Sequence, residues 1–206
     1  MTGPALSVFT VGHSTHTPEE FIALLVGNGV TAVADVRSVP FSRLSHFKQD
    51  ALASALARKG IVYTFLGREL GARSDDPSCY EDNRVQYARL AVTELFRSGI
   101  ARLMRGAAQH CVAVMCAEKE PLDCHRTLLV AQALTEQGVS VEHILADGRR
   151  EAHAETLERL LERSGLAQDE LLRTRDDRLA DALLRREQEI AFVSHGAAAE
   201  GVGDSR

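Results

Sequence analysis

The chain alternates short apolar runs with segments of helical periodicity, and this alternation limits its fold more than any other feature. Five apolar runs rich in β-branched residues begin near Val8, Val30, Ile61, Val112 and Val141. Most segments between them repeat apolar residues at helical spacing. Strands that alternate with helices form a mostly parallel sheet with helices on both faces. The pattern therefore predicts an α/β fold: a single three-layer domain with a mostly parallel central sheet of about five strands.

A charged region follows the last predicted strand. Residues 150–163 and 176–189 carry leucines at helical spacing, which predicts two amphipathic helices that pack on the sheet. We therefore expect an α/β core over residues 1–148, a helical extension of the same domain over 149–192, and a disordered tail over 193–206. Between the third and fourth strands, the periodicity predicts two further helices, over about 84–97 and 99–108.

Composition excludes several classes of protein. Of the 206 residues, 45% are hydrophobic and 26% charged, as in an ordinary soluble domain. The chain lacks an apolar run near the roughly 20 residues that span a bilayer. Its first residues lack the features of a signal peptide, so we expect a cytoplasmic protein whose four cysteines are free. The net charge of −5 argues against wrapping an extended nucleic acid. The sequence names no cofactor and no oligomeric state.

Polar residues gather where the predicted strands end. The first three strands are followed by His13, Ser14, Asp35, Arg37, Ser42, Arg43 and Arg68. The fourth strand ends in Cys116 and is followed by Glu118, Lys119, Cys124, His125 and Arg126. The carboxyl ends of parallel strands meet at one edge of the sheet, where open α/β sheets bind their ligands. The sequence therefore predicts one site at this edge.

The residue types suggest roles within this site. The candidates for catalysis are His13, Asp35, Cys116, Glu118, Cys124 and His125, with His13 and Glu118 as acid and base. The candidates for ligand binding are Ser14, Arg37, Ser42, Arg43, Arg68, Lys119 and Arg126. Arg126 and the free amides of the helix after Cys124 would bind an anion and lower the pKa of that thiol. We therefore expect a phosphate-bearing ligand, such as a nucleotide or a nucleic-acid end.

Each of these residues also has a structural interpretation. Cys116 and Cys124 could be small core residues, and Asp35 with Arg37 could be a purely structural ion pair. His13 could cap the turn into the first helix, and His125 could be a buried, hydrogen-bonded histidine. The sequence leaves these alternatives open.

Five segments resemble the domain-of-unknown-function 488 family. They are TVGHST (10–15), ADVRSVPFSR (34–43), GIVYTFLGRELG (60–71), CAEKEPLDCHR (116–126) and VEHILADG (141–148). The resemblance covers about residues 6–148 and extends toward residue 192. It implies a shared site at the sheet edge and does not specify a reaction.

Three other functions stay open. The strand-end cysteine and the upstream DVR are similar to a rhodanese sulfurtransferase, but Arg126 follows Cys116 by ten residues, too far for a rhodanese loop. A metal site could use Cys116, Cys124 and His125, with or without His13. Seven residues separate the two cysteines, however, and adjacent Cys and His rarely bind one ion, so we expect no bound metal. The C-terminal helices could instead make the chain a non-catalytic interaction module.

Overall fold

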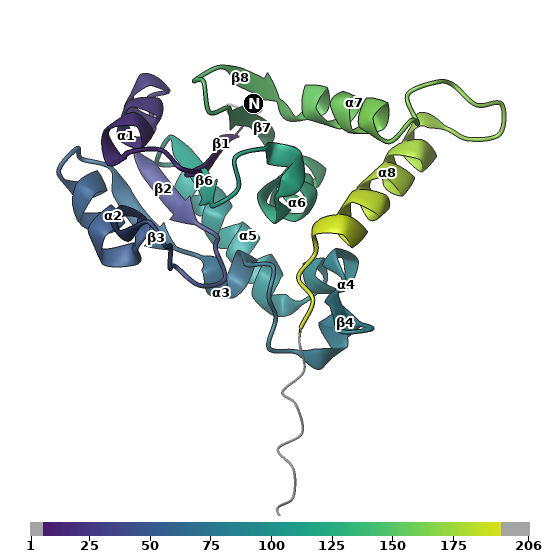
Figure 1. Cartoon of the computed structure of the whole chain (residues 1–206), viewed down its shortest axis with the longest axis horizontal. Coiled ribbons are helices and arrows are strands. Elements are labelled where there is room, and N and C mark those ends of the chain that lie inside the picture. The colour runs from purple at the N-terminus through teal and green to yellow at the C-terminus, as the bar shows by residue number, and fades with distance from the viewer. Residues whose placement is uncertain (1–5, 195–206) are drawn as a thin grey trace, which may run out of the picture.

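A six-stranded sheet with helices on both faces forms the centre of the protein (Figure 1). The computed structural model describes residues 6–194, so most of the predicted disordered tail, residues 195–206, lies outside the described residues. The strand order is β3-β2-β6-β1-β7-β8. The predicted three-layer α/β class with a mostly parallel sheet is confirmed.

The five predicted apolar runs form the five parallel strands of the sheet. These are β1 (Ser7–Gly12), β2 (Ala32–Asp35), β3 (Val62–Phe65), β6 (Val112–Cys116) and β7 (Ser140–Ile144). The sixth strand, β8 (Arg150–Ala152), pairs antiparallel with β7. Residues 150–152 were expected to begin a helix. This expectation is wrong, because these residues pair with the otherwise free edge of β7.

Helices cover the sheet in two layers. One face carries α1 (Pro18–Gly27) and α2 (Gln49–Ala57), preceded by the short helix η1 (Ser45–Phe47). The other face carries α3 (Gly67–Leu70), α5 (Glu94–Ala107), the π-helical η4 (Arg126–Ala131), α6 (Gln132–Glu136) and α7 (His153–Arg163). The remaining helices are η2 (Pro77–Cys79), α4 (Tyr87–Ala91), η3 (Pro121–Asp123) and α8 (Arg175–Ile190).

The segment between β3 and α5 departs from the sequence prediction. The predicted helix over 84–97 is interrupted: β4 (Tyr80–Glu81) and β5 (Arg84–Val85) form a separate hairpin, and α4 ends before Thr93. The side chain of Thr93 accepts a hydrogen bond from the Phe96 amide and so begins α5 as its N-cap. Val85 donates its amide to the carbonyl of Phe192, a contact with the far end of the chain.

The two faces of the sheet bury separate apolar clusters. Phe21 and Leu56 belong to the cluster under α1 and α2, and Ile100 and Leu134 to the larger one on the opposite face. The central strand β6 is buried at all five positions. Its carboxyl end therefore delivers Cys116 to the middle of the sheet edge. Among residues 6–194, the structure contains no helix that is long and apolar enough to cross a membrane.

Candidate functional site

The loop between β6 and η4 crosses the end of β1. His13 and Ser14 donate their amides to the carbonyls of Cys116 and Ala117 (2.9 Å each), which continues the β1–β6 pairing beyond the sheet. A Cβ atom on Gly12 would lie 1.9 Å from the carbonyl oxygen of Glu118. The loop can therefore pass this close to the backbone of β1 only because residue 12 is glycine.

Arg126 holds this loop from the inside. Its side chain is fully buried, and its Nη1 and Nη2 donate to the carbonyls of Glu118 (2.7 Å) and Lys119 (3.3 Å). We expected Arg126 at the sheet edge as a ligand for anions. The structure instead places its guanidinium behind the loop, where its visible partners are backbone carbonyls.

Two sulfurs and one imidazole meet at the start of η4. His125 Nδ1 lies 3.8 Å from the sulfur of Cys116 and 3.8 Å from that of Cys124. One donor atom from each of these three residues lies within 4.8 Å of the other two. The seven residues between the two cysteines therefore do not keep these donor atoms apart. A fourth polar group is close, because Glu118 Oε2 lies 2.9 Å from the Cys124 sulfur.

The pKa values of the side chains in this cluster shift in different directions. Burial alone would raise the pKa of Cys124, but the Cys116 thiol, Arg126 and His125 together hold it well below its usual value. The pKa of Cys116 is well above its usual value because of its hydrogen bond with Cys124 and then its burial. Burial of the Glu118 carboxyl group raises its pKa, and the nearby Cys124 sulfur raises it further. Of the two thiols, Cys124 is therefore the more acidic.

A second polar group lies beside the first, at the end of β2. Asp35 is fully buried and accepts hydrogen bonds from Arg37 Nη2 and from the Tyr63 hydroxyl, each 2.7 Å long. Arg37 also donates to the carbonyl of Phe47 (2.9 Å). These contacts complete the hydrogen bonding of the carboxylate and support the interpretation of Asp35 and Arg37 as an internal ion pair.

His13 joins this second group through both ring nitrogens. Nε2 lies 3.3 Å from Arg37 Nη1, and Nδ1 lies 3.0 Å from the carbonyl of Ser14. Guanidinium only donates and a carbonyl only accepts, so the geometry assigns the proton to Nδ1. Burial lowers the pKa of His13 to about 4, and the ring stacks on Phe47 at 4.2 Å. His13 is therefore neutral near pH 7.

A cavity of about 510 Å³ opens next to the thiols. The predicted site residues that line it are Arg37, Cys116, Glu118, Cys124 and His125. The lining residues that sequence reasoning missed include Arg73, Tyr87, Ile190 and Phe192. They come from the β3–β4 connection, α4 and the end of α8, where the sequence has no motif and only tertiary contacts bring them to the sheet edge.

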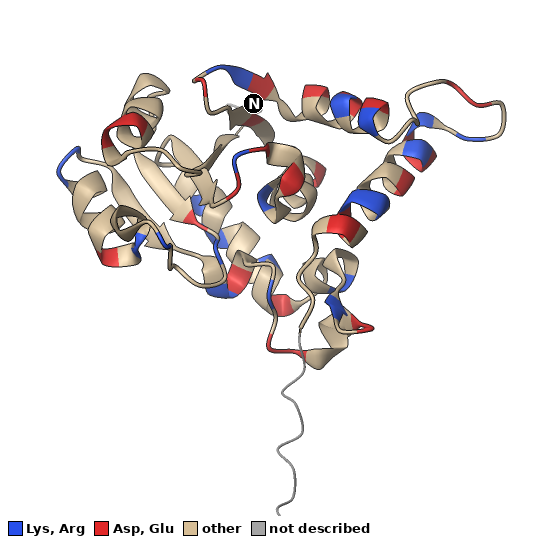
Figure 2. Cartoon of the chain, viewed as in Figure 1, with Lys and Arg blue, Asp and Glu red and all other residues tan. Residues whose placement is uncertain are grey.

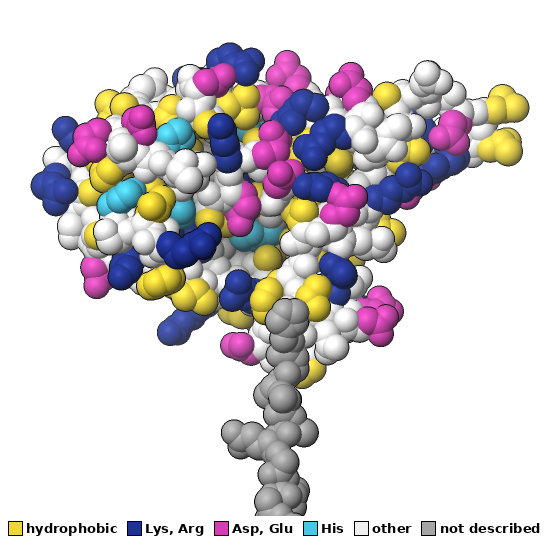
Figure 3. Space-filling view, viewed as in Figure 1, with side chains coloured by type: hydrophobic (Ala, Val, Ile, Leu, Met, Phe, Trp, Pro, Cys, Tyr) yellow, Lys and Arg dark blue, Asp and Glu magenta, His cyan; other side chains and the backbone are white. Residues whose placement is uncertain are grey.

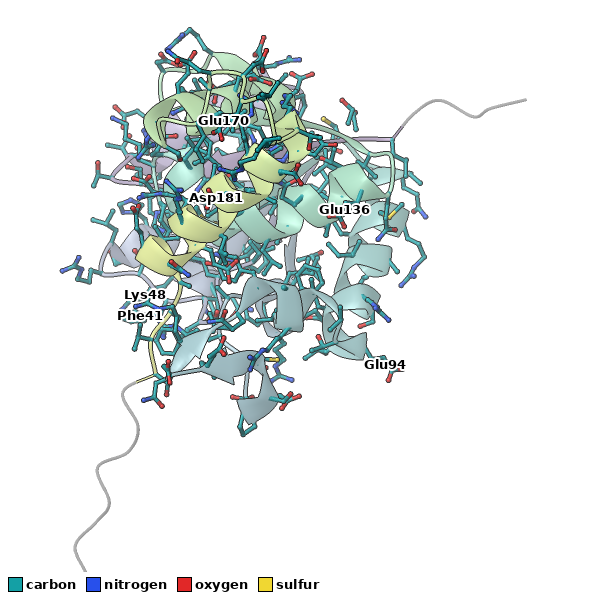
Figure 4. The ribbon with its side chains drawn as sticks, turned by 90° about the vertical axis from the view of Figure 1, so that its right-hand side faces the viewer. Phe41, Lys48, Glu94, Glu136, Glu170 and Asp181 are labelled. Atoms are coloured by element: carbon teal, nitrogen blue, oxygen red, sulfur yellow. The ribbon has the colours of Figure 1, made fainter. Side chains whose placement is uncertain are left out.

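A second hollow of about 670 Å³ adjoins the cavity, because Phe41 and Ala117 line both. It takes in four predicted residues, His13, Ser14, Ser42 and Arg43. Phe41 is 60% exposed, and the Lys48 ammonium lies 5.3 Å from its ring centre, so the two side chains lie side by side in Figure 4. The cavity and the hollow together form a longer groove with an aromatic side chain between them.

Two predicted residues line neither of these hollows. Arg68 is exposed on α3. Lys119 lines a further depression, which adjoins the second hollow because Ser14 and Thr15 line both. The predicted site is therefore brought together in part: its cysteines, His125 and Glu118 share one cavity, while Asp35 and Arg126 support it from behind.

Charges are distributed unevenly over the molecule. On α7 and α8, basic and acidic side chains alternate (Figure 2), and Arg159 and Arg185 form ion pairs there with Glu151 and Asp181. On the sheet side, His side chains reach the surface with Lys and Arg side chains near them (Figure 3). The arginines of these two helices are paired with carboxylates, so they are poor candidates for anchoring an anionic ligand.

Fold and site together define an α/β domain with a cysteine- and histidine-lined cavity at the carboxyl edge of its sheet. The family described as "Domain of unknown function DUF488" matches residues 17–133, more than half of the chain. The chain belongs to this family. Neither the curated proteins nor the solved structures contain a significant match.

Proposed function

We propose that the chain is an enzyme that binds a small ligand with a phosphate or similar anionic group in the 510 Å³ cavity. Its reactive groups would be Cys116, Glu118, Cys124 and His125. The observation that carries the proposal is that one cavity is lined by these four residues and by the exposed guanidinium of Arg73. Cavities of about 300–1,000 Å³ hold small ligands. A ligand there would contact an exposed guanidinium and the reactive groups at once.

The groove also supports a ligand with a planar ring. Arg73 stacks on Phe192 at 4.4 Å, which leaves the edge of its guanidinium free to donate to phosphate oxygens. Phe41 offers an exposed ring between the two hollows, and bases stack well on aromatic side chains. Ser42 and Arg43 add donors in the second hollow. These features favour a nucleotide or the end of a nucleic-acid strand.

Glu118 is the residue best placed to transfer a proton to or from a ligand in the cavity. Its carboxylate lines the cavity and lies 2.9 Å from the Cys124 sulfur. His13, the other predicted acid–base group, has both ring nitrogens occupied by Arg37 and Ser14. We therefore assign His13 to holding the loop and Glu118 to exchanging a proton with the ligand.

The test is ligand binding by an Arg73→Ala variant. Nucleotides and phosphorylated sugars are first screened by thermal shift on the whole chain, and hits are measured by calorimetry. Loss of a charged hydrogen-bond donor should weaken binding at least about tenfold. Arg97→Ala, an exposed arginine on α5 outside the cavity, should leave affinity unchanged. The proposal fails if the panel gives no binding, or if both variants bind as well as the wild type.

A further inference from the structure

We infer that Cys116, Cys124 and His125 form a binding site for one divalent transition-metal ion, zinc foremost, with an open coordination position toward the cavity. A catalytic role for this ion rests on the proposed function, because the ion would be the reactive group of that cavity. Binding of the ion itself rests only on the arrangement of the three side chains.

Distances between the donor atoms fit a tetrahedral ion. With zinc–sulfur bonds of about 2.3 Å and zinc–nitrogen bonds of about 2.0–2.1 Å, tetrahedral angles put sulfur and nitrogen about 3.6 Å apart. His125 Nδ1 lies 3.8 Å from each sulfur, and the three donor atoms lie within 4.8 Å of one another. The sulfur–nitrogen distances therefore need shifts of only about 0.2 Å. Side-chain rotation would bring the two sulfurs, which lie within 4.8 Å of each other, to the roughly 3.8 Å that tetrahedral angles require.

The orientation of the imidazole is that of a metal ligand. His125 Nε2 lies 3.1 Å from the carbonyl oxygen of Val36, which can only accept, so Nε2 carries a hydrogen. Nδ1 is thereby the nitrogen left to hold a proton or an ion between the two sulfurs. Histidines that bind metals commonly fix their other nitrogen on a backbone carbonyl in this way.

Backbone geometry explains how two adjacent residues can share one ion. Cys124 is extended (φ −141°, ψ 139°), whereas His125 is already helical (φ −60°, ψ −23°). The change of direction between them turns both side chains toward Cys116. The Arg126 contacts with the carbonyls of Glu118 and Lys119 hold the loop in this path.

The donor set favours zinc and leaves room for chemistry. Two thiolates and an imidazole are soft to borderline ligands that select zinc and related ions over magnesium or calcium. Catalytic zinc sites typically have three protein ligands and a fourth position for water or substrate. Cys116, Cys124 and His125 all line the cavity, so a fourth ligand would enter from there. Binding would release the thiol protons to solvent.

The experiment is a metal titration of the whole chain. After treatment with a chelator and a reductant, the protein is titrated with Co²⁺, and zinc is then added to displace it. We expect one ion per chain, with the thiolate-to-cobalt charge transfer and the visible bands of tetrahedral cobalt. Cys116→Ser, Cys124→Ser and His125→Gln should each weaken binding at least about 100-fold. Circular dichroism checks that each variant is folded.

A matched control and a wild-type measurement keep the inference falsifiable. Cys111→Ser removes a partly buried cysteine at the other end of β6 and should leave binding unchanged. In the wild type, one equivalent of zinc per chain should abolish the cobalt bands. Uptake no greater than that of a Cys116→Ser/Cys124→Ser double variant, or equal loss in Cys111→Ser, overturns the inference. Ion binding with no ligand bound by the nucleotide panel would instead refute only the proposed function.

Discussion

At the residue scale, the shape of the site depends on the missing side chain of Gly12. Gly12→Ala would place a Cβ atom 1.9 Å from the carbonyl oxygen of Glu118 and 3.3 Å from Arg126 Nη2. The loop must shift to accommodate it, so we expect a loss of about 2 kcal/mol or more in the free energy of unfolding. Urea unfolding measures this change, and cobalt spectra report any distortion of the cysteines.

Gly106 is the matched control for Gly12. It lies within α5, and its Cβ would meet no described atom within 4 Å. Gly106→Ala should therefore stabilise the protein by up to about 1 kcal/mol, because alanine favours helix. If both substitutions change stability equally, the close approach at Gly12 does not restrain the loop.

Buried histidines make the protein sensitive to acid. Burial lowers the pKa of His153 to about 4, from 6.5 in the unfolded chain, and His153 Nδ1 lies 3.0 Å from His143 Nε2. Because the folded pKa is lower, the unfolded state binds more protons between these two values. The stabilisation is therefore complete above pH 6.5 and is lost as pH falls toward 4, by up to about 3 kcal/mol for one group.

Urea unfolding at a series of pH values measures this loss. His153→Gln should flatten the dependence between pH 6.5 and 4, because it removes one titrating group. His110→Gln, at an exposed position, should leave the slope as in the wild type. An unchanged slope in His153→Gln would contradict the assignment.

At the element scale, α8 forms one wall of the cavity. Arg186 donates from Nε to the carbonyl of Leu122 (3.0 Å) and from Nη2 to Asp123 (2.6 Å), so it holds η3 in place. Glu187 accepts the amide of Tyr87 at the start of α4 (2.6 Å). Sequence periodicity predicted the helix, but these contacts give it a position beside the site.

Arg186→Ala should loosen the turn before Cys124. We expect faster amide exchange over residues 121–125 with a loss of at most about 1 kcal/mol in global stability, since the ion pair is partly exposed. Hydrogen exchange with mass spectrometry measures both quantities. Arg185→Ala is the control, because this neighbour pairs only with Asp181 within α8 among the described contacts. Equal exchange in the two variants would show that α8 does not brace η3.

At the scale of the whole molecule, the connection between α7 and α8 projects from the body (Figure 1). Leu171 and Leu172, in the turn that the Glu170–Arg173 bridge closes, are 99% and 92% exposed. Leu157, Leu160 and Ala182 on the flanking helices belong to the same apolar cluster as Ile100 of α5. This shared core supports the prediction that residues 149–192 extend the main domain.

Limited proteolysis tests that prediction. A chymotrypsin-like protease should cut first at Leu171 or Leu172, where the backbone is most accessible. The two fragments should then elute together in gel filtration, because the cluster and the Arg186 contacts hold α8 to the body. Fragments that separate without denaturant would indicate that the C-terminal helices form an independent unit.

The sequence by itself determined the five parallel strands and their order along the chain, because buried runs and helical spacing are local patterns. The start of α1 is also a local pattern, because Thr17 and Glu20 form a capping box with Pro18 in the first turn. Because parallel strands share a direction, the concentration of polar residues after the strands pointed to the sheet edge at which the cavity opens.

Only the tertiary structure decided which of these residues face the cavity. Arg126 is buried behind the loop and Arg73 reaches the cavity. The spacing of residues along the sequence predicts neither position. The same holds for β8, whose pairing depends on the free edge of β7. Cys116 and Cys124 come together because Gly12 and Arg126 fold the loop back on itself. Burial and pairing of side chains depend on contacts between distant segments, and periodicity along the chain does not encode those contacts.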